Sequence, residues 1–233
     1  MLNFTLFTAN VRGDKGNCVY PNRVEVTNRE AFKEAMQYDH VCGAFRNNYR
    51  SNSNFLESNV IAMDCDNDHS DNPGSWVTPE EVAKAFGEVA FYVNYSRNHM
   101  KIKGSKSARP RFHIYFPIPT MTSGAEYNEL KKRIQEHFPY FDAGALGEAR
   151  FFFGTQNPQV EIYEGTELSQ DFVDSYYKAL ENYYGMQVDE MNTYAFISDY
   201  YFVASPFRSE VGFNYDSGTM TTIWNYIYNK MSV

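Results

Sequence analysis

The sequence predicts an α+β fold, in which a split β-α-β-β-α-β core of the ferredoxin or RNA-recognition (RRM) type carries an additional N-terminal α/β lobe. Three observations lead to this class. Between residues 59 and 165, short apolar runs rich in β-branched and aromatic residues alternate with two segments that begin with helix-capping signals. The 233 residues are 43% hydrophobic and 21% charged, which excludes disordered, collagen-like and coiled-coil chains. The sequence contains no internal repeat, so we expect one compact unit.

The predicted elements follow in order along the chain. Strands are expected at 2–8, 59–64, 89–95, 111–116, 149–153 and 159–163. Helices are expected at 29–37, 78–87, 123–138, 170–184 and 221–230. These elements divide into an N-terminal lobe (1–58) packed on the core, an RRM-like core (59–165) and a C-terminal helical and aromatic extension (166–233).

Local signals justify these elements. Asn28 caps the first helix, and the capping box Thr78-Pro-Glu-Glu81 with proline at the first helical position opens the second. A second capping box, Ser123-x-x-Glu126, opens the third helix, which must end before Pro139. Pro117 is expected to close the strand that begins at residue 111, and residues 44–59 are polar and predicted to be loop-rich.

The overall charge hides a strong segregation. The 29 acidic and 21 basic residues give a net charge of −8, which argues against nucleic-acid binding if taken alone. However, residues 57–90 hold eight acids and one base, whereas residues 97–113 hold six bases and no acid. In a split βαβ core the third strand lies between the first and second, so the acidic strand end and the basic loop are expected at the same end of the sheet.

The composition also predicts the compartment. No run approaches the ~18 apolar residues of a membrane helix, and the N-terminus has no secretory pattern. Cys18, Cys42 and Cys65 form no CxxC motif, so we expect free thiols in a reducing cytoplasm and no zinc site.

Asp64-Cys-Asp66 lies where an apolar strand ends. Residues i and i+2 of a strand share a face with Cα atoms ~6.6 Å apart, so both carboxylates could bind hard divalent cations. Asp142 follows the third helix and is a candidate third ligand. A bare DxD also occurs in solvated acidic turns, and that interpretation stays open at this point.

Arg109-Pro-Arg111-Phe-His113 places three cationic or potentially cationic side chains two residues apart. On a strand they would share one face, where arginine forks and an imidazole could bind phosphate oxygens. Arg150 is a further candidate phosphate contact. The remaining candidates for weak nucleic-acid or phosphate contact are Arg46, Arg50, Arg97, Lys101, Lys103 and Lys106.

Together these segments resemble the archaeo-eukaryotic primase superfamily, and most of all the primase–polymerases of phages, plasmids and other mobile elements. The resemblance rests on Val60-Ile-Ala-Met-Asp64-Cys-Asp66, on Arg109-Pro-Arg111-Phe-His113-Ile-Tyr-Phe-Pro and on Phe141-Asp142 with Arg150-Phe-Phe-Phe-Gly154, over residues 40–165. It implies that Asp64, Asp66 and Asp142 are catalytic and hold two Mg²⁺ or Mn²⁺ ions, and that Arg109, Arg111, His113 and Arg150 hold the incoming triphosphate. The family often has a small hydroxyl residue where this chain has Arg111.

The implied activity is that of a template-directed nucleotidyltransferase, a DNA primase or DNA polymerase or both, in the replication of a phage or mobile element. Its partners would be NTP or dNTP and a single-stranded DNA template with primer, in the cytoplasm of a bacterial or phage-infected cell and away from membranes. Relatives often continue into a helical priming domain or a helicase. Two alternatives remain: a non-catalytic RRM-like module that binds single strands, and a metal-dependent replication-initiation nuclease.

Overall fold

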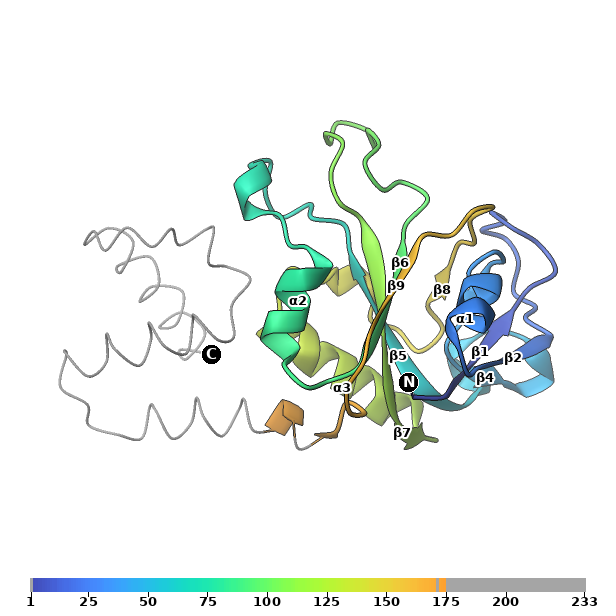
Figure 1. The fold of residues 1–233 in the computed structure, drawn as a ribbon. Coiled ribbons are helices and arrows are strands. Elements are labelled where there is room, and N and C mark those ends of the chain that lie inside the picture. The colour runs from blue at the N-terminus through green and yellow to red at the C-terminus, as the bar shows by residue number, and fades with distance from the viewer. Residues whose placement is uncertain (1, 171, 175–233) are drawn as a thin grey trace, which may run out of the picture.

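The computed structural model describes residues 2–170 and 172–174 (Figure 1). The N-terminal elements are β1 Phe4–Thr8, β2 Asn22–Val26, α1 Arg29–Ala35, β3 His40–Val41 and β4 Ala44–Phe45. The central elements are β5 Phe55–Cys65, α2 Pro79–Phe86, β6 Phe91–Tyr95, β7 Phe112–Met121, α3 Gly124–His137, β8 Phe151–Phe152 and β9 Val160–Tyr163. The expected α+β class is therefore confirmed. No helix within these residues has the length and apolarity to cross a membrane.

The strands form two antiparallel sheets. One has the order β2-β1-β3-β8 and the other the order β4-β5-β7-β6-β9. Both β5 and β6 pair with β7 in antiparallel fashion, so they run parallel to each other and α2 connects them. In the register of β5 and β7, Asp64 lies opposite His113, and Asn94 of β6 lies on the other side of the same histidine.

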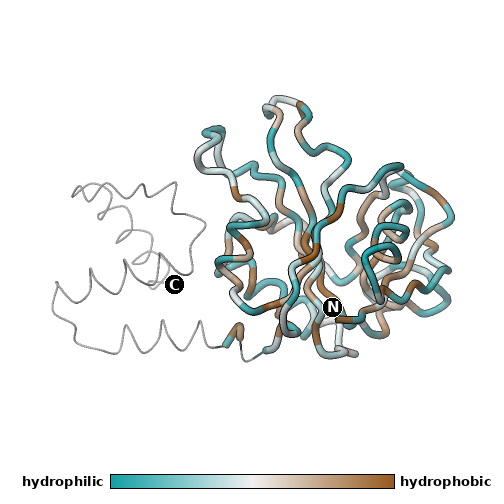
Figure 2. Tube along the Cα trace, viewed as in Figure 1, coloured by the Kyte–Doolittle hydropathy of each residue, from teal (hydrophilic) through white to brown (hydrophobic). Residues whose placement is uncertain are grey.

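Both faces of the central sheet are covered. Figure 1 shows α2 and α3 on one side and the N-terminal elements on the other. Alternation along β5 sends Ile61 and Met63 into the core against the helices, whereas Val60 and Ala62 join a second core with Phe4 of the N-terminal lobe. Figure 2 shows the hydrophobic stretches gathered along the central strands and the hydrophilic ones in the outer loops. Side chains on the second face are therefore enclosed between the sheets.

The expected starts of the first three helices are confirmed. The Asn28 side chain accepts from the Ala31 amide. Thr78 and Glu81 form the reciprocal capping box of α2. The Ser123 side chain accepts from the Glu126 amide at the start of α3. Each cap satisfies an amide that would otherwise lack an intrahelical partner, so the boundaries follow from local sequence.

The strand bounds differ from expectation by more than two residues in two places. β5 begins at Phe55, inside the segment expected to be loop. β7 continues through Pro117 to Met121. The proline is tolerated because it lies opposite Val60, where the ladder with β5 shifts register.

The segment expected to be the fourth strand of the split βαβ unit takes a different position. It forms only the short β8, which pairs with β3 in the N-terminal sheet, and β9 occupies the edge next to β6. The Asp39 carboxylate accounts for this placement, since it accepts from the amides of Gly13, Asp14 and Gly154 and so ties β8 to the N-terminal lobe. The division at residues 58 and 165 stays a prediction, and the helices expected at 170–184 and 221–230 lie mostly or wholly outside the described residues.

Candidate active site

Asp64 is enclosed at the end of β5 on the side that faces the N-terminal lobe. Its side chain is 8% exposed. One carboxylate oxygen, Oδ2, lies 3.3 Å from Nη2 of Arg150, and the other, Oδ1, lies 3.5 Å from Nε2 of His113. Oδ1 is buried and accepts no hydrogen bond within the described chain. One buried carboxylate oxygen is therefore left open to a further ligand.

Asp142 is held next to Asp64 by the backbone. The Asp142 amide donates to the Asp64 carbonyl oxygen at 2.8 Å. The Asp142 side chain accepts from the Gly144 amide at 2.8 Å, which fixes the turn that follows α3. Lys131 of α3 supports the same turn, because it is buried and its ammonium donates to the Ala145 carbonyl at 3.1 Å. Two of the three predicted acids, distant in sequence, are thus brought together.

The charge state of Asp64 reflects these neighbours. Burial, helped by the nearby carboxylates of Asp66 and Asp142 and opposed by Arg150, raises the pKa of Asp64 to about 7. Like charges that disfavour one another's ionised forms lie close in space. A divalent cation among the three carboxylates would relieve this repulsion, because it favours their charged forms.

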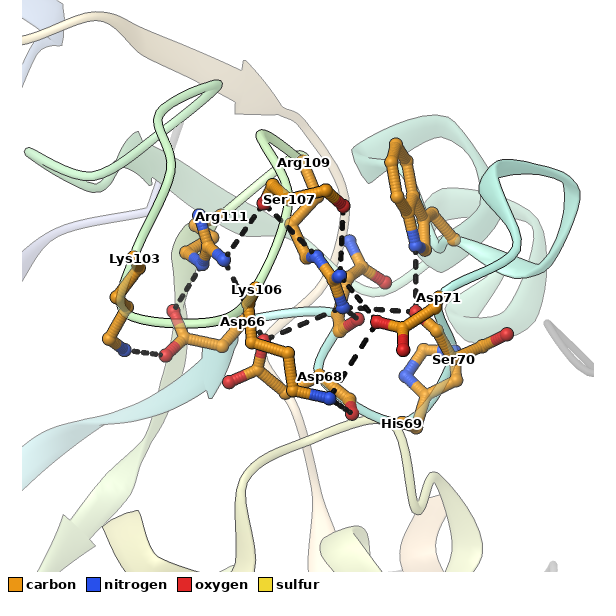
Figure 3. Close-up of polar contacts among 12 residues, drawn as sticks. Asp66, Asp68, His69, Ser70, Asp71, Lys103, Lys106, Ser107, Arg109 and Arg111 are labelled. Atoms are coloured by element: carbon orange, nitrogen blue, oxygen red, sulfur yellow. Dashed lines mark hydrogen bonds and ion pairs between the residues drawn. The ribbon is translucent and has the colours of Figure 1, made fainter.

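Asp66 contacts two cations from the loop between β6 and β7. Its Oδ2 is paired with the Lys103 ammonium, and its Oδ1 lies 3.7 Å from Nε of Arg111 (Figure 3). The Asp66 side chain remains 19% exposed, and that of Lys103 46%. The carboxylate is therefore accessible but already neutralised by the protein's own cations.

Arg109 and Arg111 lie at the end of the same loop, next to β7, and both side chains are completely buried. The guanidinium of Arg109 donates to the carbonyls of Asn67 at 2.9 Å and Ser70 at 3.0 Å, and to Asp71 at 2.7 Å (Figure 3). That of Arg111 donates to the carbonyl of Lys101 at 2.8 Å. The condition under which these arginines would share a strand face with the following histidine is not met, since β7 begins only at Phe112. Their contact with a nucleotide stays a prediction, but both have structural partners.

His113 faces Asp64 as the alternation of β7 predicted. Its neighbours Phe112 and Ile114 point to the opposite core. Burial lowers the pKa of His113 to about 4, so the imidazole is neutral at neutral pH. Its ring lies 4.7 Å from that of Phe152, and its Nδ1 has no hydrogen-bond partner in the described chain.

The six weaker candidates differ in their surroundings. Arg50 donates to the Ala149 carbonyl at 3.0 Å and lies over the Phe151 ring. Arg97 lies 3.7 Å from the Phe153 ring centre. The others are Arg46, which is exposed, and the three lysines Lys101, Lys103 and Lys106 of the β6–β7 loop. Only Lys103 touches one of the predicted acids among the contacts described.

Three residues near the site were missed from the sequence. His40 and Tyr115 are buried between the sheets, and the Tyr115 hydroxyl lies 2.6 Å from Nε2 of His40. Because Nδ1 of His40 must donate to the Tyr38 carbonyl, Nε2 accepts the proton of the tyrosine. Asn94, fully buried beside His113, is the third. Its signal was a polar amide inside an otherwise apolar strand.

Asp64, Asp66 and Asp142 have the oxygen donors that a hard cation prefers, but their side chains do not converge on a common position. Within residues 2–170 and 172–174, no three His, Cys, Asp or Glu side chains form a group that could hold a metal ion. Carboxylate oxygens are the donors that Mg²⁺ and Mn²⁺ prefer, and the open Oδ1 of Asp64 is one of them. For Asp66 to join, its carboxylate must exchange the Lys103 ammonium for the ion.

Comparison with known proteins gives a similarity to a solved structure but no match in sequence. No protein-family model and no curated protein sequence matches the chain. Among solved structures, the chain is similar to the AEP domain of the primase-polymerase (PrimPol) of cyanophage S-2L, with 15% identity and a TM-score of 0.40 over 74% of this chain and 85% of that one. At this identity and score, the similarity assigns neither an activity nor a site to the chain.

Proposed function

We propose that the protein is a template-directed nucleotidyltransferase, a DNA primase or DNA polymerase or both, that joins NTPs or dNTPs with two Mg²⁺ or Mn²⁺ ions. The observation that carries the proposal is the 2.8 Å hydrogen bond from the Asp142 amide to the Asp64 carbonyl. It brings an acid from the end of α3 to the acids that end β5. Acids that repel one another at a sheet end, beside a cluster of cations, are the arrangement that phosphoryl transfer needs.

In this function Asp64, Asp66 and Asp142 would hold the ions. When bound, the ions promote attack of a 3′-hydroxyl on the α-phosphate and stabilise charge on the departing pyrophosphate. Lys103 and Arg150 now neutralise Asp66 and Asp64, and both would turn to the triphosphate once the carboxylates are otherwise neutralised. Each cation that leaves a carboxylate then gains a phosphate oxygen as its partner.

The remaining polar residues would bind and position. The neutral imidazole of His113 can donate one hydrogen bond to a phosphate oxygen without adding charge. Arg109 and Arg111, buried beneath, would fix the acidic turn and the basic loop on either side of the entrance. Their guanidinium charges also make the local potential more favourable for a polyanion.

The fold disfavours the alternative of a non-catalytic RRM-like module. Such modules stack bases on aromatic side chains exposed on the sheet. Here the aromatic residues of the central strands are buried: Tyr92, Phe112, Tyr115 and Phe116 are each at most 1% exposed. The central sheet therefore offers no free aromatic platform within the described residues.

The test is incorporation of labelled NTPs and dNTPs on single-stranded and primed templates, with Mg²⁺ and with Mn²⁺. The Asp64→Asn, Asp66→Asn double variant should lose at least about 100-fold in rate, since loss of bound ions removes several kcal/mol of transition-state stabilisation. Glu30→Gln changes an exposed acid in the first turn of α1 and serves as the matched control. Normal incorporation by the double variant would reject the proposal, and release of short products from labelled DNA would favour a nuclease instead.

A further inference from the structure

The loop between β6 and β7, residues 96–111, carries an apolar tip that the fold does not use. Ile102 is 78% exposed and Met100 is 53% exposed, the two highest values among the exposed large hydrophobic residues of the described chain. Figure 1 shows this loop projecting beyond the end of the central sheet. Leaving an isoleucine in water forgoes the stabilisation that its burial would give.

Hydrogen bonds at the base of the loop hold the tip outward. Arg111 donates to the carbonyls of Asn98 at 3.2 Å and Lys101 at 2.8 Å, and the Met100 amide donates to the Arg109 carbonyl at 3.0 Å. Met100 has a φ of 52°, a conformation that a side chain of this size rarely adopts. Two completely buried arginines and a strained residue thus fix the loop in a shape that exposes its apolar side chains.

The charges around the tip select its partner. Lys101 and Lys103 flank Ile102 directly, and Lys106 follows on the returning arm of the loop. Lys103 also contacts Asp66, so Ile102 is the immediate neighbour of a residue that reaches the candidate active site. A polyanion with apolar faces complements this pattern, and single-stranded nucleic acid has both, because its bases are not hidden by pairing.

We propose that the β6–β7 loop binds the single-stranded template next to the site, with Ile102 and Met100 packed on the bases and Lys101 and Lys106 on the phosphates. The proposal rests on the function proposed above and specifies how that function holds its template. It predicts that two apolar residues, in addition to the lysines, contribute to the affinity for the template.

Binding of fluorescent single-stranded DNA, measured by anisotropy in EDTA without nucleotide, tests the proposal. Ile102→Ser with Met100→Ser should raise Kd about tenfold, which corresponds to partial burial of the two side chains against the bases, and should leave the salt dependence of Kd unchanged. Lys101→Ala with Lys106→Ala should raise Kd and also lower the slope of log Kd against log salt, because fewer counterions are released. Leu56→Ser, at a site 44% exposed on β5, is the matched apolar control and should bind like the wild type.

The outcomes separate this inference from the proposed function. Equal binding by the wild type and the Ile102→Ser, Met100→Ser variant overturns the inference even if nucleotides are incorporated. Weakened binding by that variant, in a protein that incorporates no nucleotide, supports the loop's role and rejects the polymerase assignment. Light scattering compares the oligomeric states of the two proteins. If the wild type is an oligomer and the same variant is a monomer, the tip contacts a second copy and the inference is wrong.

Discussion

Replacing Arg109 tests whether this buried arginine holds the acidic turn of residues 66–71. In Arg109→Met the hydrogen bonds to the Asn67 and Ser70 carbonyls and to Asp71 are lost, while the side-chain volume is roughly kept. Asp71 is 78% exposed and regains water, so most of the loss comes from the two carbonyls. Hydrogen bonds from a charged donor contribute about 1.5–3 kcal/mol each, so we expect a loss of about 3 kcal/mol in the free energy of unfolding.

Urea unfolding followed by tryptophan fluorescence measures this loss, because Trp76 lies 5.3 Å from the Arg109 guanidinium. Lys106→Met is the matched control: it removes a cation 3.7 Å from the same Asp71, but at a side chain 36% exposed. A pair that exposed contributes little to stability, so Lys106→Met should unfold like the wild type. If Arg109→Met keeps wild-type stability and raises only the KM for nucleotide, Arg109 binds nucleotide and the structural role given to it is wrong.

Three further predictions concern the site, a buried histidine and a close backbone contact. Lys103→Met should tighten Mn²⁺ binding up to about fivefold in a paramagnetic resonance titration, since the exposed ion pair with Asp66 contributes at most about 1 kcal/mol; unchanged or weaker binding would contradict the exchange of cations. Burial lowers the pKa of His40 to about 4, so as the pH falls from ~6.5 to 4 the unfolded chain binds a proton that the folded chain does not, and stability falls as the pH falls. His40→Gln should make that decline shallower by about 2 kcal/mol in urea unfolding at pH 7 and pH 4.5, and equal declines would refute the cause. A Cβ at Gly165 would overlap the Glu88 carbonyl oxygen, so Gly165→Ala should lose about 1–3 kcal/mol in thermal unfolding while Gly147→Ala, with open space around it, changes little; equal stability of the two variants would exclude the close contact.

Local chemistry made part of the fold predictable. The caps at Asn28 and Thr78 are confirmed because a helix start is decided by a few adjacent residues. The alternation that turns His113 toward Asp64 is equally local, since successive side chains of a strand point to opposite faces. Asp142 was expected near Asp64 only as a candidate third ligand, and the metal site itself remains untested.

The other features depend on contacts between distant segments. β8 joins the N-terminal sheet because the Asp39 carboxylate, more than a hundred residues earlier, accepts from the Gly154 amide. Nothing in the spacing of Arg109 and Arg111 distinguishes an exposed phosphate ligand from a buried arginine whose partners are loop carbonyls. Sequence patterns give the residue types and their faces, whereas burial depends on which loop folds over them.

Counting bound Mn²⁺ tests the central claim that Asp64, Asp66 and Asp142 close around the same ions. Paramagnetic resonance of free Mn²⁺, titrated with the protein and a non-hydrolysable nucleoside triphosphate, should give two ions per wild-type chain. Asp142→Asn should lose at least one of them while unfolding like the wild type, because its side chain is exposed and its backbone bond to Asp64 is kept. Two ions with unchanged affinity in Asp142→Asn, or none in the wild type, would contradict the account.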